Sequence, residues 1–214
     1  MAYIGNKPAN KAIVASDLDP AVITGQTALA VAPADTDEFL ISDAGTLKRL
    51  DASLIGGGKI GQVVSTVKSD TFTSVSTSYA DVTGMSVAIT PSATSSKVLV
   101  MATLNVGNNT NDRWSAYQLL RGSTAISIGD ASGSKTRASA GSVRVTATGS
   151  QNLVTNMSVI FLDSPSSTDE QTYKIQGKVQ SGGAVLTFNR PGNATDADYV
   201  VHTASSITAI EVLA

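Results

Sequence analysis

The 214-residue sequence has no cysteine, one histidine, one tryptophan and few charged side chains. Without cysteine the chain can form neither a disulfide nor a thiolate metal site, and a lone histidine nearly excludes a zinc centre. Charged residues make up 15% of the chain, well below the share of roughly a quarter that is usual in globular proteins. This scarcity disfavours long solvent-facing helices, so the abundant Ser, Thr, Gly, Ala and Val favour strands and turns.

The charge balance and the lack of long apolar runs narrow the possible partners. The net charge is −2 and the isoelectric point is about 5.3, and the basic residues are scattered. Nothing therefore indicates a nucleic acid or an acidic membrane as partner. Residues 1–7 lack the apolar run of a signal peptide, and no stretch approaches the roughly 18 apolar residues of a membrane span. We expect a protein made without Sec-type export and not inserted into a membrane.

Catalytic machinery is hard to assemble from this sequence. His202 would have to be the base of any Ser-His-Asp triad, and no G-x-S-x-G nucleophile elbow accompanies it. The acids of a glycoside hydrolase would have to come from the short loops at 163–170 and 196–198, in a chain with only 5% aromatic residues. The glycines at 56–58 lack the frame of a phosphate loop. We expect no enzymatic activity, no catalytic residue, no metal and no cofactor.

Three consecutive glycines, 56–58, divide the chain into an N-terminal segment, residues 1–58, and a C-terminal head, residues 59–214. The first segment is too small and too poor in aromatic residues to build a good core by itself. The dipeptide Asp19-Pro20 is typical of a helix start.

A β-hairpin is predicted within the N-terminal segment. Residues 39–43 and 46–50 flank Ala44-Gly45, with the glycine supplying a positive φ. Residues 51–55 then predict a single capped turn.

About ten short strand signals, separated by turns rich in Gly, Ser and Asn, follow the glycines. With no helical period among them, they predict an all-β head, either a β-sandwich or a jelly roll. The predicted strands are 60–67, 85–89, 98–106, 114–120, 125–128, 142–147, 153–162, 172–179, 184–188 and 206–213.

Some predicted strands alternate and others do not. In 172–179 the apolar residues point one way and three polar residues, Lys174, Gln176 and Lys178, point the other. By contrast, 98–102, 159–162 and most of 207–213 are apolar on both faces. A sandwich needs a polar outer face, so these strands predict a second face covered by another subunit. The alternative is that they lie in the middle of a monomeric barrel.

Several stretches, taken in order, resemble the small trimeric tail fibres of bacteriophages of environmental bacteria, including cyanophages. They cover most of the chain, and Gly61 departs from them because a larger apolar residue is usual there. They are 1–9 (MAYIGNKPA), 37–49 (DEFLISDAGTLKR), 57–64 (GGKIGQVV), 76–87 (STSYADVTGMSV), 89–91 (ITP), 95–100 (SSKVLV), 120–124 (LRGST), 162–165 (LDSP) and 173–176 (YKIQ).

The resemblance implies a homotrimer with a C1q- or TNF-like jelly-roll head, in which one sheet of each subunit lines the three-fold axis. It implies a virion protein, made in the host cytoplasm, whose irregular N-terminal segment attaches to other virion proteins of the tail or baseplate. The head would bind a host-surface polysaccharide or an outer-membrane receptor. The residues that we expect to attach the N-terminal segment to the virion are Tyr3, Ile4, Leu18, Ile23 and Phe39.

Binding groups concentrate on loops, so polar and aromatic residues on or beside predicted loops are the candidates for receptor contact. Trp114 has two interpretations. Exposed, it could stack on a sugar ring; buried, it is a core residue, which the high average burial of tryptophan favours. The receptor-binding candidates are Trp114, Arg137, Asn189, Arg190, Asp198 and Tyr199.

Two other functions stay open at this point. The chain could be a capsid-decorating, head-fibre or collar protein that binds only other virion proteins. It could also be a polysaccharide depolymerase, although no motif supports that chemistry.

Overall fold

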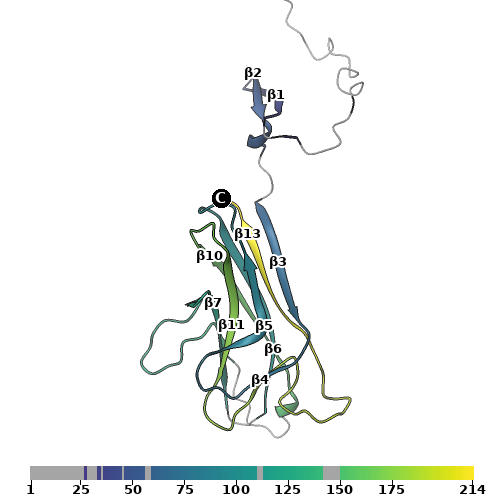
Figure 1. Cartoon of the computed structure of the whole chain (residues 1–214), viewed down its shortest axis with the longest axis vertical. Coiled ribbons are helices and arrows are strands. Elements are labelled where there is room, and N and C mark those ends of the chain that lie inside the picture. Colours follow the sequence, from purple (N-terminus) through teal and green to yellow (C-terminus); the bar gives the residue numbers. More distant parts are fainter. Residues whose placement is uncertain are drawn as a thin grey trace, which may run out of the picture. The chain divides into compact units, whose positions relative to one another are not determined.

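The computed structural model describes residues 27, 33–34, 36–44, 46–55, 59–109, 113–141 and 150–214 (Figure 1). The chain divides into two compact units, residues 1–56 and 57–214, and each is considered by itself. The predicted helix start at Asp19-Pro20 and the predicted strand 142–147 lie outside the described residues, as do four predicted attachment residues, Tyr3, Ile4, Leu18 and Ile23.

The first unit contains the predicted β-hairpin. Strand β1 (Glu38–Asp43) pairs antiparallel with β2 (Thr46–Asp51), and a 3₁₀ turn, η2 (Ala52–Leu54), follows. In the turn, Ala44 has a positive φ of 49°, while Gly45, the residue expected to supply it, lies outside the described residues. Phe39 lies on β1 with 39% of its surface exposed.

The head consists of two antiparallel sheets, named here the β6 sheet and the β11 sheet after their central strands. The chain passes repeatedly from one sheet to the other, which is the connectivity of a jelly roll, and the predicted all-β jelly-roll fold is confirmed. The β6 sheet contains β3 (Ile60–Lys68), β13 (Ser205–Val212), β6 (Lys97–Asn108), β12 (Leu186–Phe188) and β4 (Phe72–Ser74), with β10 (Thr155–Asp163) also paired to β6. The β11 sheet contains β5 (Ala80–Ile89), β11 (Gln171–Val179), β7 (Ser115–Arg121) and β8 (Thr124–Ile126), with β9 (Ala140–Gly141) also paired to β7.

Every predicted head strand that lies within the described residues overlaps an observed one. Two strands were missed, β4 and β9, because they are short and carry little apolar alternation. Strand β5 begins at Ala80, five residues before the predicted start at 85, because pairing with β11 extends through a register shift.

The core lies between the two sheets and is built from alternate residues of each strand. On β6 the inward residues run from Val98 through Leu104 to Val106, all essentially inaccessible to water. Phe188 packs edge-on against Tyr117 and Phe72, with ring centroids 5.6 and 6.2 Å away. Each fully buried side chain of this kind contributes about 1.5–3 kcal/mol to folding.

A buried polar group ties the sheets together at one point. Asp163, on β10, accepts hydrogen bonds from the Tyr173 hydroxyl (2.7 Å) and from Arg121 Nη1 (2.8 Å), which come from the other sheet. Burial, with the neighbouring Asp163 carboxylate, raises the pKa of Tyr173. Asp163, one of the acids in the loop considered for hydrolysis, therefore has a structural role.

The unusual Gly61 is explained by the residue opposite it. Glu211 is only 2% exposed, and its Oε1 accepts hydrogen bonds from the Ser92 backbone and hydroxyl, both at 2.6 Å. A Cβ at position 61 would lie 2.7 Å from Glu211 Oε2. The larger side chain expected there would therefore displace a buried carboxylate.

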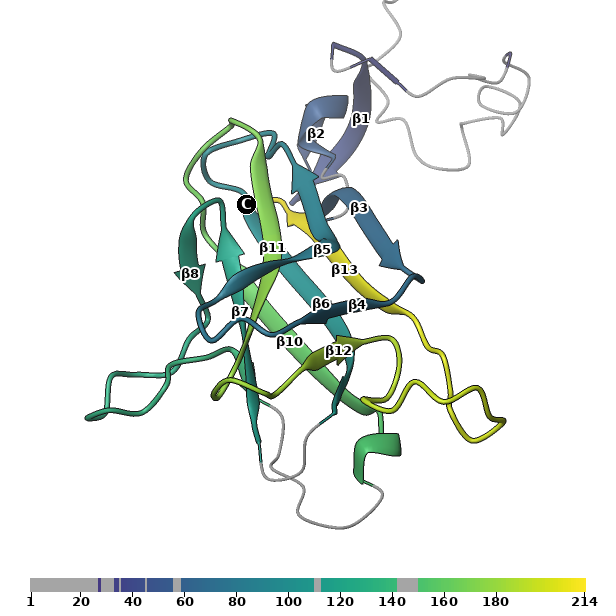
Figure 2. The same cartoon turned by 60° about the horizontal axis from the view of Figure 1, so that its bottom comes forward.

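The two ends of the head are distinguished by where the chain enters. The Leu213 amide donates to the Lys59 carbonyl (2.9 Å), so the entry point and the C-terminus meet at one end, the proximal end. Loops 69–71, 75–79, 180–185 and 189–204 gather at the opposite, distal end, which is turned toward the viewer in Figure 2.

Candidate functional site

Four strands of the β6 sheet, in the order β3, β13, β6 and β10, carry a continuous row of aliphatic side chains on their outer face. Val63 pairs with Ile210, which pairs with Leu99, which pairs with Leu162. The next row ends in Met101 and Ile160. We call these six residues, Val63, Leu99, Met101, Ile160, Leu162 and Ile210, the apolar face.

The apolar face is open in the single chain. Ile160 is 62% exposed, Val63 58%, Leu162 46% and Met101 41%. The prediction that these strands are apolar on both faces is confirmed. The monomeric-barrel alternative is wrong, because the strands form a sandwich whose outer face is accessible to water.

Toward the distal end the same face becomes polar. The third row contains Ser206, Thr103 and Ser158, and its one apolar side chain is Val67 at the β3 edge, which is 66% exposed. Beyond it, Asn156 Nδ2 donates to Asn105 Oδ1 at 2.9 Å. The apolar face is thus confined to the proximal half of the sheet.

The outer face of the β11 sheet is polar and internally hydrogen-bonded. Asp81 accepts bonds from Lys174 Nζ (2.9 Å) and Gln176 Nε2 (2.7 Å), and Gln118 continues the chain to Gln176. Hydrogen bonds from Lys174 and then Gln176 lower the pKa of Asp81. The predicted alternation of Lys174, Gln176 and Lys178 against an apolar inner face is confirmed.

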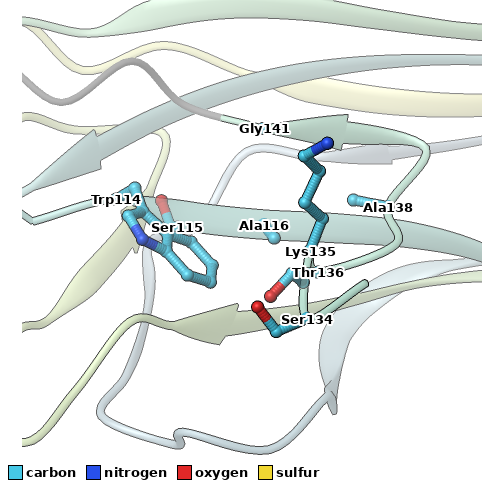
Figure 3. A pocket seen from close by; sticks show the side chains of 8 residues that line it. All are labelled: Trp114, Ser115, Ala116, Ser134, Lys135, Thr136, Ala138 and Gly141. Atoms are coloured by element: carbon cyan, nitrogen blue, oxygen red, sulfur yellow. The ribbon is translucent and has the colours of Figure 1, made fainter. Parts of the chain in front are cut away.

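A pocket of about 520 Å³ opens beside this polar face, where the start of β7 meets the loop between β8 and β9 (Figure 3). Trp114 forms one side of it, and the loop side chains of Ser134, Lys135 and Thr136 lie opposite. Ala116 forms the floor, and Ser115, Ala138 and Gly141 complete the lining. We call this the Trp114 pocket.

Trp114 is partly exposed in this pocket. Lys178 Nζ lies over its ring, 5.8 Å from the centroid, and 5.6 Å from the centroid of Tyr79. Lys178 does not line the pocket, so the indole is held by a neighbouring cation while still facing the cavity. The favoured interpretation of Trp114 as a core residue is wrong: it is half-buried, lies just before β7 and is not part of the core between the sheets.

Hydrogen bonds between side chains and the backbone anchor the loop that supplies the opposite wall. Ser139 Oγ accepts from the Leu119 amide (2.9 Å) and donates to the Ile126 carbonyl (3.2 Å). Arg137 Nε donates to the Gly129 carbonyl, and the Tyr79 hydroxyl donates to the Arg137 carbonyl, both at 2.6 Å. The wall is therefore tied to both the edge and the face of the β11 sheet.

The other predicted contact residues fall in loop 189–204. Asp198 and Tyr199 are exposed, the latter by 56%. Arg190 is partly buried, donates to the Pro191 carbonyl (3.1 Å) and lines a second cavity of about 400 Å³ with Asp196 and His202. These residues lie at the distal end, whereas Arg137 lies beside the Trp114 pocket.

Asn189 is not a surface residue, so the expectation that it contacts a receptor is wrong. It is fully buried with a φ of 62°. Its Nδ2 donates to the carbonyls of Lys68 and Asp70, both at 2.8 Å, and its Oδ1 accepts from Ser205 Oγ (2.6 Å). An asparagine adopts this backbone conformation more readily than most residues, and here it anchors the start of loop 189–204.

The sequence did not single out Ser134, Lys135, Thr136 or Lys178 as site residues. The sequence indicated only that Ser134, Lys135 and Thr136 lie in a predicted loop, 129–141, and that Lys178 lies on the polar face of strand 172–179. The pairing of β9 with β7, in which Ala116 lies opposite Gly141, brings the loop residues Ser134, Lys135 and Thr136 to Trp114, and β9 carries no strand pattern of its own. Lys178 comes to Trp114 through the pairing of β11 with β7, in which it lies opposite Ala116.

In the part of the chain that the structure describes, no group of three or more His, Asp or Glu side chains could hold a metal ion. Over those same residues, no helix has the length and apolarity needed to cross a membrane.

Comparison with known proteins finds similar solved structures but no similar sequence or family. No protein-family model matches the chain, and no curated protein matches its sequence. Among solved structures, infectious bursal disease virus Gt strain is similar at 13% identity with a TM-score of 0.39, over 80% of this chain and 41% of that one. The VP2 subviral particle of the same virus is similar at 11% identity with a TM-score of 0.38, over 84% of this chain and 43% of that one. The chain therefore spans less than half the length of these structures.

Proposed function

We propose that the chain is a homotrimeric virion fibre protein of a tailed bacteriophage, which attaches through its N-terminal segment and meets the host surface with its head. It binds without catalysing a reaction. The sequence resemblance to small tail fibres supports the phage assignment. The apolar face supports the association of copies.

The apolar face is the observation that carries the proposal. Exposed apolar patches of this continuity mark surfaces that associate. Its rows cross β3, β13, β6 and β10, so sister copies can cover it only by packing these sheets against one another. Around a three-fold axis each copy would bury Leu99, Ile160 and Leu162 against its neighbours, while the hydrogen-bonded outer face of the β11 sheet would stay in water.

The direction of the chain supports the division of roles. Because the chain enters the head at Lys59, the distal loops lie at the end that is free to approach a host. Those loops carry Arg190, Asp198 and Tyr199. The Trp114 pocket and Arg137 open to the side of the same head. Phe39 remains the predicted attachment residue on the described hairpin.

The first test is the mass of the purified full chain by light scattering. We expect three times the 21.8 kDa of one chain, independent of dilution over the micromolar range. A stable monomer would overturn the trimer.

The second test asks whether the protein has a receptor role. Purified protein should compete with phage for adsorption to host cells, and antibody labelling of virions should mark the tail. Labelling of the capsid or collar without competition would instead make the chain a structural protein that binds only other virion proteins.

A further inference from the structure

The Trp114 pocket combines three chemical features that point to one class of ligand. An indole ring forms one wall, hydroxyl groups lie opposite it, and a basic side chain, Lys135, lines the cavity beside them (Figure 3).

The hydroxyl groups of Ser134 and Thr136 line the cavity. In the described part of the chain no hydrogen-bond partner is found for either. A hydroxyl can both donate and accept, so this wall suits a ligand that carries hydroxyl groups of its own. The indole opposite offers a large rigid apolar surface, which suits the C–H face of a sugar ring.

The one charged side chain that lines the pocket is basic. Lys135 lines the cavity and donates to the neutral Ser132 hydroxyl (2.9 Å), and Lys178 lies over the Trp114 ring. Within the described ranges neither lysine has an acidic partner, and neither do Arg113 and Arg137, the sequence neighbours of lining residues. By contrast, Lys174 on the same sheet does form an ion pair, with Asp81. Charge-assisted hydrogen bonds favour an anionic ligand here.

We propose that the Trp114 pocket binds an acidic sugar unit of a polysaccharide, with its ring against Trp114 and its carboxylate or sulfate at Lys135. This proposal rests on the host-binding role of the head and specifies the ligand of one site on it. The second cavity, near Arg190, suits an anion less well, because Asp196 lines it together with that arginine.

Trp114 is the single tryptophan of the chain, so its fluorescence reports on this pocket without labelling. The full-length protein is titrated with oligogalacturonate, dextran sulfate and neutral dextran. We expect the emission to shift with one or both anionic polymers and to stay unchanged with neutral dextran. The response that is seen identifies the carboxylate or the sulfate as the preferred group. The apparent affinity should fall as salt rises.

Variants locate the binding site. Lys135→Gln should weaken binding about two- to fivefold, as expected for one exposed charge pair. Trp114→Leu, followed by calorimetry because it removes the fluorophore, should weaken it about tenfold. The matched control is Lys59→Gln, which removes an exposed lysine at the proximal end and should leave binding unchanged.

The outcomes separate this proposal from the host-binding role. No response to either anionic polymer at millimolar sugar, an equal response to neutral dextran, or no effect of Lys135→Gln would each overturn the acidic-sugar assignment. If the protein still competes for host adsorption in those cases, the proposed function stands with a different ligand. If competition is absent as well, both proposals fail.

Discussion

On the outer face of the β11 sheet, Lys174 and Gln176 both donate hydrogen bonds to Asp81, whereas the outer face of the β6 sheet carries Leu99, Ile210 and Leu162 side by side. Both sheets bury apolar inner faces against the same core. The difference between them is therefore not required by the sandwich. One face is hydrogen-bonded within a single copy, and the other is the face that we propose sister copies cover. An apolar outer face on only one sheet would give the proposed association a direction.

The largest expected effect comes from placing a charge on the apolar face. Ile160→Glu should convert the trimer to monomers, because assembly would bury carboxylates at a cost of several kcal/mol each. It would also lose the contribution of about 1.5–3 kcal/mol from each buried isoleucine. Light scattering measures the mass of the variant, and circular dichroism tests whether its head remains folded.

The matched control places the same charge on the other sheet. Ser86 lies on the outer face of β5, opposite Lys174. The variant Ser86→Glu should leave the mass of the protein unchanged. If Ile160→Glu stays trimeric, or if Ser86→Glu dissociates the protein equally, the assignment of the interface to the β6 sheet is wrong.

The next effect concerns the bridge between the sheets. Asp163→Ala removes the acceptor shared by Tyr173 and Arg121 and leaves a buried hydroxyl and a largely buried guanidinium without it. We expect the free energy of unfolding to fall by about 3–5 kcal/mol, measured by urea denaturation. Asp169→Ala, in the exposed loop nearby, should change it by less than about 0.5 kcal/mol. Equal effects would mean that the bridge adds nothing.

A smaller effect is expected at the proximal end. Gly61→Ala would force Glu211 away from its position and should destabilise the head by about 1–3 kcal/mol. Gly182→Ala is the control, because an added Cβ there meets nothing within 4 Å. Thermal unfolding compares the two variants, and similar melting temperatures would show that Glu211 can move freely.

Acidification tests the same carboxylate. Hydrogen bonds from Ser92 lower the pKa of Glu211 below its ordinary value of 4.5. A lowered pKa in the folded state stabilises the fold above the unfolded value, and this contribution is lost as the pH falls through the folded value. The stability of the head should thus decline below about pH 4.5, and less so in Glu211→Gln. An equal decline in both proteins would assign it to other carboxyl groups.

The sequence predicted the fold well because the head strands carry strong local patterns. Val98 to Ala102 is apolar at every position, and 172–179 alternates, so the two kinds of outer face were visible before the structure. The Trp114 pocket was only half predicted, because its far wall depends on β9, a two-residue strand recognisable only by its pairing with Tyr117 and Ala116. Asn189 was wrongly predicted to lie at the surface, because the sequence does not distinguish an asparagine whose amide faces water from one whose amide is buried. Here the amide is hydrogen-bonded inside the head at the start of a loop.

The smallest expected effect is on the polar face, and it sharpens the comparison most directly. Lys174→Met removes a cation whose side chain is 27% exposed, paired to an aspartate whose side chain is 55% exposed. Because the pair is solvated, we expect a loss of less than about 1 kcal/mol in unfolding free energy. The pKa of Asp81 should rise toward 3.8, its ordinary value, while the bond from Gln176 keeps it somewhat lower, which an NMR titration can follow. A larger loss of stability, or a change in mass, would mean that this face also contacts a partner, and the two sheets would then differ in chemistry but not in role.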